Sequence, residues 1–467
     1  MKLTEVHICA IISFNPDFLI LFHKTVMKKI LVLGAGFVAG PLVRYFLERA
    51  SAEVIVADIE VEKAKILVGV HPRGKAIALN VKDEEALKTE IADSDIVISL
   101  VPHIFHPVVA KLCVALRKNM VTTSYVSEAM KALDKDARRA GIIILNEVGL
   151  DPGIDHMEAM RIIHEVKDGG GTILGFTSFC GGLPAPEANT NPFGYKFSWS
   201  PRGVLLAGKN AAHYLKDGKE IHVPAESLFD HYAMIPIKGL GDFEGYPNRD
   251  SFPYIELYGI RETRTMFRGT LRYASWCETL KKIGEIGLLD QTEKDLRGQT
   301  YLGLVKSLIG TGNEKDIKNA LRIKLDLRPD SKILDRLEWL GLFSEEPVPF
   351  KKGCPLDVLE ILMLKKLQYE KGERDMVILQ HEFMARDSTG KKQKITSTFV
   401  DFGIPGGDSS MARLVGLAAA AGTRLILEGK IRRTGVSIPV HPEIYGPILE
   451  ELEEHGIIFE EKKDSVL

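Results

Sequence analysis

The chain has 467 residues, which predicts two or three domains, because a single hydrophobic core rarely extends beyond about 250–300 residues. Hydrophobic residues make up 45%, charged residues 27%, and the net charge is −2, which is typical of globular domains and excludes the basic excess of a nucleic-acid-binding protein. The five cysteines are scattered without a C-x-x-C pair, so we expect no disulfide framework, no metal site and a cytoplasmic location.

The first residues contain two apolar stretches, ICAIISF and DFLILF, that Asn15, Pro16 and Asp17 separate. A membrane-spanning helix needs about 20 consecutive apolar residues, so we expect no membrane anchor here. Met27 stands directly before the first strand-like run. We therefore interpret residues 1–27 as an N-terminal extension outside the folded domains.

A glycine-rich turn follows the strand-like run KKILVLG. In GAGFVAG, Gly34, Gly36 and Ala39 form a G-x-G-x-x-A pattern, and the helical stretch PLVRYFLERA comes directly after it. Glycines at these positions allow a tight turn and a close approach of the pyrophosphate, which binds at the helix N-terminus. Strand-like and helical segments then alternate to about residue 150, which predicts a Rossmann domain around a parallel sheet.

Asp58 ends the second strand-like run, EVIVAD, and bears on the choice of dinucleotide. A carboxylate there can accept both ribose hydroxyls of NAD, whereas it would repel the 2′-phosphate of NADP. We therefore expect NAD, with NADP less favoured. The alternative is a solvated acid at a strand end that contacts no ligand.

Beyond residue 150 the pattern changes to longer strands and glycine-rich loops. Five segments are strand candidates, and ARDSTGKK between the last two has the composition of a hairpin turn: TILGFTSF, YIELYGI, TMFRGTLRY, MVILQHEF and KITSTFVDF. Residues 281–366 are nearly strand-free and have helical periodicity. SSMARLVGLAAAAGTRLILEG predicts a helix whose small residues suit close packing on the first domain.

The predicted fold class is therefore α/β, with a Rossmann dinucleotide-binding domain, an α/β substrate-binding and dimerisation domain, and a small helical insertion. We assign residues 28–150 and 400–467 to the Rossmann domain, 151–280 and 367–399 to the substrate domain, and 281–366 to the helical domain.

Basic residues recur in the glycine-rich loops of the second half. Each of them alone is more typical of a surface or ion-pairing position. Together they favour a substrate with more than one carboxylate, because the guanidinium fork binds carboxylates with two hydrogen bonds. These residues are Lys196, Arg202, Arg249, Arg268 and Arg272.

Several long motifs resemble the L-glutamate-forming saccharopine dehydrogenase family, also called saccharopine reductase, from about Lys28 to the C-terminus. They are SLVPHIFHP, TSYVS, NEVGLDPGIDH, FCGGLPAPE, NPFGYKFSWSPRGVL, GYPNRDS, RGTLRY, ERDMVILQHEF and HPEIYGPILEEL. The resemblance implies NAD(P)-dependent, reversible oxidation of saccharopine to L-glutamate and L-2-aminoadipate 6-semialdehyde, in lysine metabolism. It also implies a homodimer, and a Rossmann domain that the C-terminal segment completes.

The resemblance also implies two sets of site residues. Those beside the dinucleotide are Gly34, Ala35, Gly36, Phe37, Val38, Asp58, Val101, Thr122 and Leu150. Those that line the saccharopine site are Ser124, Tyr125, Asp151, Arg249, Thr270, Leu271 and Arg272. The chain departs from the family at two points. Asp58-Ile59 stands where fungal members known for NADP have Cys-Arg, which favours NAD, and His103 replaces an expected tyrosine and receives no role.

Three residues are the candidates for the catalytic centre. Asp151 is the leading candidate to hold or deprotonate the substrate amine, and its alternative is an Asx-turn residue without a catalytic part. Tyr125 would orient a carboxylate or the developing charge, or serve as an aromatic wall. Cys180 has no partner cysteine and the chemistry needs no thiol nucleophile, so we interpret it as a small polarizable wall residue. His156 is expected to cap or pack on the helix that follows it.

Two alternatives to this function remain. Lysine 6-dehydrogenase and carboxynorspermidine dehydrogenase would share the glycine turn, but the helical insertion and YPNRDS argue against them. An inactive NAD-binding regulatory protein would bind the dinucleotide without turnover, and the presence of Asp151, Tyr125 and the arginines argues against it.

Overall fold

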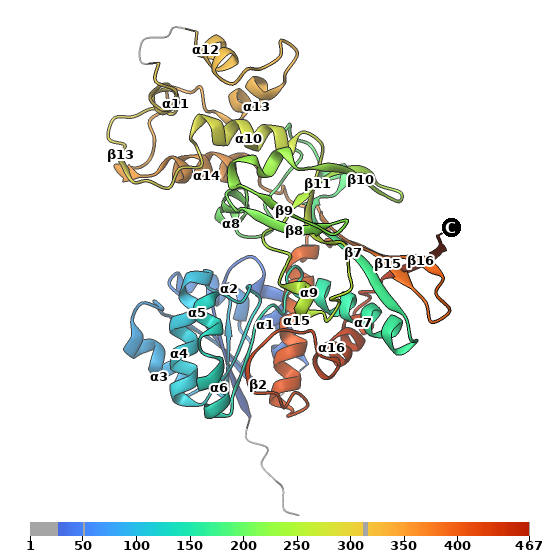
Figure 1. Cartoon of the computed structure of the whole chain (residues 1–467). Helices are drawn as coiled ribbons and strands as arrows, with labels where there is room; N and C mark the ends of the chain where they lie inside the picture. The colour runs from blue at the N-terminus through green and yellow to red at the C-terminus, as the bar shows by residue number, and fades with distance from the viewer. Residues whose placement is uncertain (1–26, 50–51, 312–315, 467) are drawn as a thin grey trace, which may run out of the picture.

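The structure is a computed structural model of the whole chain that describes residues 27–49, 52–311 and 316–466. Apart from Met27, the predicted N-terminal extension lies outside the described residues. Two sheets organise the molecule, with the first at the blue end of the colour bar and the second built mainly from green and orange segments (Figure 1).

The first sheet has seven parallel strands in the order β17-β6-β5-β4-β1-β2-β3. Its central strands are apolar runs with almost no exposed surface, as expected of a parallel sheet that is covered on both faces. The strands are β1 (Lys28–Leu33), β2 (Ala52–Asp58), β3 (Gly74–Ala78), β4 (Ile96–Ser99), β5 (Asn119–Thr122), β6 (Ile143–Leu145) and β17 (Gly435–Ser437).

Eight helices are described around this sheet: α1 (Ala39–Glu48), α2 (Val61–Val68), α3 (Glu84–Ala92), α4 (His106–Leu116), α5 (Glu128–Lys131), α6 (Asp134–Ala140), α15 (Ser410–Leu427) and α16 (Pro442–Glu454). The strand order reverses direction between β1 and β4, and ligands of such sheets bind at the carboxyl ends of the strands beside that point. The predicted Rossmann fold is therefore confirmed.

Helix α15 packs against α1, as its small residues predicted. A side chain at Gly416 would lie 3.0 Å from the backbone nitrogen of Leu42 and 3.2 Å from the carbonyl oxygen of Val38, so the two helices touch through their backbones. Within the described residues α15 is the one helix that is long and apolar enough to cross a membrane, and 78% of it is buried inside the molecule. Its apolar surface is accounted for by packing.

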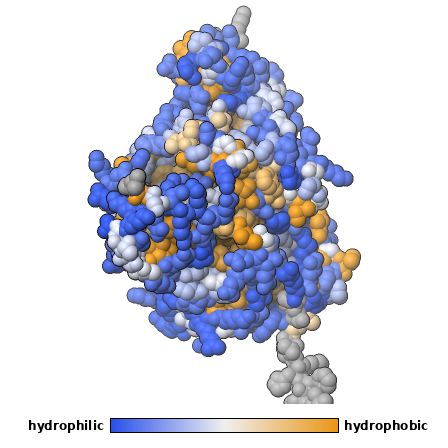
Figure 2. Space-filling model, turned by 90° about the vertical axis from the view of Figure 1, so that its right-hand side faces the viewer, coloured by the Kyte–Doolittle hydropathy of each residue, from blue (hydrophilic) through white to orange (hydrophobic). Residues whose placement is uncertain are grey.

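The second sheet has nine strands. Its main path runs β10-β11-β12-β7-β15-β16-β18, and the β8–β9 hairpin joins at β12. The strands are β7 (Thr172–Pro184), β8 (Ala212–Lys216), β9 (Lys219–Val223), β10 (Ala233–Ile237), β11 (Gly241–Pro247), β12 (Met266–Arg272), β15 (Asp375–Arg386), β16 (Lys392–Phe402) and β18 (Glu460–Ser465). Helix α7 (Ile154–Asp168) links the two sheets along the chain, and the space-filling view shows apolar side chains mainly in the middle of a largely hydrophilic face (Figure 2).

Four of the five strand candidates are confirmed as β7, β12, β15 and β16, and the last two form the predicted antiparallel hairpin. The strand prediction for YIELYGI is wrong, because Tyr254–Leu257 is the short helix α9. Tyr254 and Tyr258 are buried while Glu256 between them is exposed, which fits a helical turn, whereas a strand would place all three residues on one face.

A helical layer lies at the top of Figure 1, beyond the second sheet. Its elements are α8 (Pro201–Ala207), α10 (Trp276–Ile286), α11 (Tyr301–Ile309), α12 (Ile317–Lys324), α13 (Ile333–Leu340) and α14 (Pro355–Lys366), with a two-residue ladder of β13 (Lys294–Asp295) and β14 (Lys352–Gly353). Short 3₁₀ turns occupy His103–Phe105, Pro186–Ala188 and Ala225–Asp230. Leucines of these helices share a hydrophobic core with β11 and β12.

The C-terminal segment from residue 400 onwards contributes to both sheets. Strand β17 extends the first sheet beside β6, as expected of a segment that completes the Rossmann domain. Strand β18, however, pairs antiparallel with β16 in the second sheet, from Gln393↔Ser465 to Thr398↔Glu460. The charged composition of β18 hides this pairing from the sequence, because it lies at a sheet edge and is mostly exposed.

Candidate active site

The glycine turn between β1 and α1 has the geometry of a phosphate cradle. Gly34 has a φ of +102°, and a side chain there would lie 3.0 Å from the backbone of Leu100, so only glycine fits. A side chain at Gly36 would meet nothing within 4 Å, which leaves open space above the turn. Val38 caps α1 without a side-chain hydrogen bond, so no capping side chain occupies the helix N-terminus, where an anion would bind. These residues fit a dinucleotide pyrophosphate, and Phe37 beside them is exposed.

Asp58 closes the same turn from the end of β2. Its Oδ2 accepts a hydrogen bond from the Ala35 N–H at 2.7 Å, and its Oδ1 accepts one from the Glu60 N–H at 2.8 Å. Both carboxylate oxygens thus bind backbone amides of the protein itself. These two hydrogen bonds explain why an aspartate stands at this position. A role in binding the ribose hydroxyls is not needed to explain it.

The other residues predicted beside the dinucleotide end neighbouring strands. Thr122 is fully buried at the end of β5, Val101 follows β4 by two residues, and Leu150 is buried in the loop before α7. His106 connects the ends of β4 and β5, because its Nδ1 lies 2.9 Å from Ser99 Oγ and its Nε2 lies 3.1 Å from Thr122 Oγ1 and 2.9 Å from Ser124 Oγ. Burial lowers the pKa of His106 to about 4, so its imidazole is neutral at pH 7.

Tyr125, Asp151 and Arg268 meet between the two sheets. The Tyr125 hydroxyl donates a hydrogen bond to Asp151 Oδ1 at 2.8 Å, and Arg268 Nη2 donates to the same oxygen at 2.6 Å. The Arg268 guanidinium also lies 5.6 Å from the centroid of the Tyr125 ring. Tyr125 and Asp151 were predicted from the sequence, whereas Arg268 comes from β12, 117 residues further along the chain than Asp151.

A second buried carboxylate, Asp155, shares the same arginine. Arg268 Nη2 donates to Asp155 Oδ2 at 2.6 Å, and the Gly153 N–H donates to its other oxygen at 2.6 Å. Burial would raise the pKa of the Asp155 carboxyl, but His156, Arg268 and the Gly153 amide outweigh it and lower that pKa. Asp151 has fewer such partners, and burial together with the charge of Asp155 raises its pKa despite Arg268. Asp151 is therefore the more basic of the two carboxylates.

His156 lies below these acids in the first turn of α7 and is completely buried. Its Nε2 lies 2.8 Å from Glu147 Oε2 and its Nδ1 lies 2.6 Å from the Tyr258 hydroxyl. Glu147 in turn accepts the Val126 N–H at 2.9 Å. This network joins the loop that carries Tyr125 to the helix that follows Asp151, so His156 packs as expected and holds the two loops together.

One face of β12 carries three of the site residues, because side chains alternate along a strand. Arg268, Thr270 and Arg272 are two residues apart and share this face, and Thr270 pairs with Cys180 of β7. Leu271 points to the opposite face and belongs to the core of the helical layer. The predicted role of Leu271 in lining the substrate site is therefore limited to its backbone.

Arg272 is a buried cation without an acidic partner among the described residues. Its side chain is wedged between aromatic rings, 4.9 Å from the centroid of Tyr195 and 5.4 Å from that of Trp276, and its Nε has no hydrogen-bond partner. By contrast, Lys196 pairs with Glu373 and Arg202 pairs with Asp357, so these two basic residues are engaged elsewhere. Arg272 is thus available for an anionic ligand.

Cys180 lies beside this arrangement and is buried in the middle of the sheet. Burial raises the pKa of its thiol well above the ordinary value, and the charges of Asp151 and Asp155 add to the rise. A thiol in this state is not a nucleophile at neutral pH. Arg249 completes the surroundings from the other side, exposed to solvent and 5.2 Å from the centroid of the Tyr125 ring.

Asp155, Glu147 and His106 belong to the cluster although the sequence did not single them out. Arg268 was expected to bind a substrate carboxylate, whereas it pairs with the carboxylates of Asp151 and Asp155. Asp155 and Glu147 stand in NEVGLDPGIDH and His106 in SLVPHIFHP, so each lay inside a motif that had been noted. The sequence feature that could have identified them is the concentration of ionisable residues beside glycines and prolines. Which of these residues form ion pairs with one another, however, depends on contacts between distant segments.

Comparison with known proteins agrees with the motifs. The saccharopine dehydrogenase NADP binding domain matches residues 30–145, and the saccharopine dehydrogenase C-terminal domain matches residues 149–457. "Saccharopine dehydrogenase [NADP(+), L-glutamate-forming]" of Schizosaccharomyces pombe is 40% identical over 93% of this chain and 99% of its own length. The solved structure of apo saccharopine dehydrogenase (L-Glu forming) from Saccharomyces cerevisiae has a TM-score of 0.82 and 41% identity, covering 94% of this chain and 100% of that one. The mitochondrial alpha-aminoadipic semialdehyde synthase of Bos taurus is 40% identical over 92% of this chain, which spans 47% of that protein.

These findings contradict the expected preference for NAD over NADP. The matched N-terminal domain is described as NADP binding, and the relatives from both yeasts and from Pyricularia oryzae are named for NADP(+). The expectation relied on Asp58, whose carboxylate accepts hydrogen bonds from the Ala35 N–H of the glycine turn and from the Glu60 N–H. The family resemblance itself is confirmed over nearly the whole chain, and the protein belongs to the saccharopine dehydrogenase family.

Proposed function

We propose that this protein is an L-glutamate-forming saccharopine dehydrogenase of lysine metabolism that uses NADP(+). The observation that carries the proposal is one face of β12, where Arg268 and Arg272 flank Thr270, each two residues from it. Arg272 is buried without an acidic partner among the described residues, and Arg268 belongs to the cluster with Asp151 and Tyr125. Saccharopine has three carboxylates and a secondary amine, so a free guanidinium beside a basic carboxylate matches its chemistry.

In the proposed reaction the substrate loses a hydride from the lysine-derived carbon beside the secondary amine, and the dinucleotide, when bound, supplies the hydride acceptor. The amine must first be neutral, and water must then lose a proton as it adds to the resulting substrate imine. Asp151 accepts the amine proton and releases it to solvent, then accepts the proton of the attacking water and returns it to the glutamate nitrogen as the carbon–nitrogen bond breaks. Its raised pKa makes it a better base than an ordinary aspartate. Tyr125 holds the carboxylate in place through its hydroxyl.

Arg272 and Arg249 orient the substrate in this proposal. Arg272 binds one carboxylate in the buried end of the site, and Arg249, exposed above the Tyr125 ring, binds a second one nearer to solvent. Cys180 and Thr270 form the wall between them. Precise placement of the donor carbon contributes more to the rate than any strong base would.

A spectrophotometric assay of nicotinamide reduction tests the proposal, with saccharopine, lysine or carboxynorspermidine as substrate and NADP(+) or NAD(+) as oxidant. We expect reduction with saccharopine and NADP(+), and release of glutamate in equal amount. No reduction from saccharopine, or a strong preference for lysine, would overturn the proposed substrate. Efficient turnover with NAD(+) but not with NADP(+) would contradict the proposed cofactor.

Two variants separate catalysis from folding. Asp151→Asn should lower kcat/KM by about 10²–10⁴, the usual contribution of a general base, while NADP(+) binding measured by calorimetry stays unchanged. Asp168→Asn, at the exposed end of α7, is the matched control and should behave as the unaltered protein. NADP(+) binding without turnover by the unaltered protein would instead favour a regulatory role.

We further propose that the protein forms a homodimer in the cytoplasm, as the family resemblance and the scattered cysteines led us to expect. Light scattering coupled to size-exclusion chromatography measures the mass in solution, and a monomer at micromolar concentration would contradict the dimer. Fractionation of cells that express the tagged protein tests its location.

A further inference from the structure

The β8–β9 hairpin brings two histidines and a glutamate together outside the candidate active site. The hairpin turns at Asp217 and Gly218, which both have positive φ as a two-residue type I′ turn requires. His213 and His222 are directly opposite each other across the two strands, and Glu220 precedes His222 by two residues. Opposed residues and residues two apart face the same side, so all three side chains gather on one face of the hairpin.

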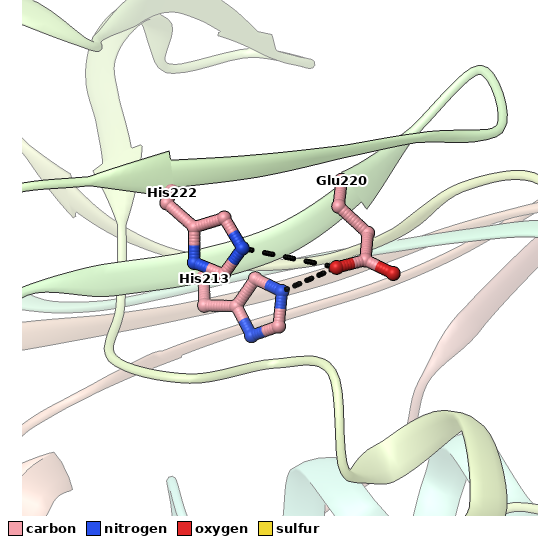
Figure 3. Close-up of side chains that lie close together, drawn as sticks. All are labelled: His213, Glu220 and His222. Carbon is pink, nitrogen blue, oxygen red and sulfur yellow. Dashed lines mark ion pairs between the residues drawn. The ribbon is translucent and has the colours of Figure 1, made fainter.

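One nitrogen of each imidazole ring points toward the same carboxylate oxygen of Glu220 (Figure 3). His213 Nε2 lies 3.5 Å and His222 Nε2 lies 3.7 Å from Glu220 Oε2, and the three atoms all lie within 4.8 Å of one another. Metal–ligand bonds of about 2.0–2.1 Å at tetrahedral angles separate the ligand atoms by about 3.4 Å. The two separations to the glutamate therefore already match. The rings of His213 and His222 are stacked, with centroids 4.0 Å apart and an interplanar angle of 12°, so a shared ion requires the exposed His222 ring to turn out of the stack.

A second carboxylate orients His213. Asp250 Oδ1 lies 3.2 Å from His213 Nδ1, and the Phe252 N–H donates to the same oxygen at 2.9 Å, which holds the aspartate in position. A carboxylate beside Nδ1 favours the proton on that nitrogen, which leaves the lone pair on Nε2, and metal-binding histidines nearly always have a carboxylate, carbonyl or water partner at the other nitrogen. His213 Nε2 is buried and has no hydrogen-bond partner among the described residues. It faces Glu220 with nothing between them to offset the carboxylate charge.

We propose that His213, Glu220 and His222 form a binding site for a divalent transition-metal ion such as Zn²⁺, with Asp250 as the outer carboxylate. Two imidazoles and one carboxylate, with a fourth position for water, are a ligand set that zinc accepts in proteins, whereas Mg²⁺ and Ca²⁺ prefer oxygen ligands alone. We expected no metal from the sequence, because that expectation considered only the cysteines.

The proposed metal site lies beside the loop that carries Arg249 and Asp250. The His213 N–H donates to the Arg249 carbonyl at 3.1 Å, and the His213 carbonyl accepts the Ser251 N–H at 2.7 Å. The segment that holds Asp250 is thus anchored to the hairpin on both sides. A metal ion at His213 would tie the hairpin to the loop that presents Arg249 to Tyr125.

Isothermal calorimetry with ZnCl₂ on the EDTA-stripped, full-length chain tests the proposal. We expect one saturable ion per chain, with affinity at least tenfold lower in each of His213→Gln, Glu220→Gln and His222→Gln. His231→Gln, an exposed histidine of the same domain, is the matched control and should bind as the unaltered chain does. Equal binding by the three variants, or no saturable binding by the unaltered chain, would overturn the proposal.

Co²⁺ provides a readout of the ligand atoms. We expect the visible bands of a four- or five-coordinate Co²⁺ complex without sulfur-to-metal charge transfer, and we expect Zn²⁺ to displace them. Thiolate charge-transfer bands would place the ion on a cysteine and refute the site. Asp151→Asn should bind Zn²⁺ unchanged, so the result is independent of whether the proposed enzymatic function is correct.

Discussion

Replacing Arg268 by methionine tests the electrostatics of the candidate active site. The guanidinium is almost fully buried and is the shared partner of Asp151 and Asp155, with Nη2 2.6 Å from each carboxylate. Methionine has a similar length and no charge. Asp155 would keep the Gly153 amide and His156, but Asp151 would keep only the Tyr125 hydroxyl. The unpaired charge therefore falls on Asp151, which becomes protonated.

The cost of this protonation follows from linkage. An aspartate that stays protonated at pH 7 in the folded chain, but has a pKa of about 3.9 in the unfolded chain, costs about 1.4 kcal/mol for each of the roughly three intervening pH units. The upper limit of the loss is therefore about 4 kcal/mol, because the pKa of Asp151 is already raised in the unaltered protein. Removing one partner of a buried ion pair typically costs about 3–5 kcal/mol, which agrees. Because the folded-state pKa of Asp151 is raised, the loss is largest at high pH and falls to about 1.5 kcal/mol at pH 5.

Urea unfolding at pH 5 and pH 7, followed by circular dichroism, measures this loss. Arg268→Met should unfold about 3–4 kcal/mol more easily at pH 7, and adding Asp151→Asn should restore much of the difference. Arg264→Met, an exposed arginine just before β12, is the control and should stay within about 0.5 kcal/mol. An equal loss at both pH values, or a double variant no more stable than the single one, would refute the reasoning.

Three further outcomes follow from burial. Cys180→Ser should keep most of the activity in the saccharopine assay, because the thiol is protonated and serves as a wall, and complete loss would give it a chemical role. Gly153→Ala should lower the thermal midpoint strongly, since its φ is +152° and the new Cβ would lie 2.1 Å from a backbone oxygen of the same turn, whereas Gly446→Ala, which meets nothing within 4 Å, should not. Burial lowers the pKa of His106 and of His381 to about 4, so as pH falls from about 6.5 toward 4 the unfolded chain binds protons that the folded chain does not, and each histidine removes about 1.4 kcal/mol of stability per pH unit. An unfolding free energy that falls equally steeply in His381→Asn would contradict this.

Much of the fold could be predicted because its signals are local. A buried parallel strand reads as an apolar run such as ILVL, and Gly34 of GAGFVAG reports a turn whose backbone leaves no room for a side chain at that position. The long helix at Ser410–Leu427 follows from composition alone. The error at YIELYGI shows the limit of such signals, because a short apolar run is compatible with either a strand or a helical turn until its neighbours are known.

The candidate site was predicted only in part, because only some of its features are local in the sequence. The sequence by itself determined the motifs that carry Tyr125 and Asp151, and the resemblance that identified the family. Only the tertiary structure decided that Arg268 lies between Asp151 and Asp155, that Asp58 binds the Ala35 amide of the glycine turn, and that His213 faces Glu220 and His222. Periodicity and turn composition depend on neighbours along the chain, whereas the pKa and the partners of a buried charge depend on which distant segments exclude water from it.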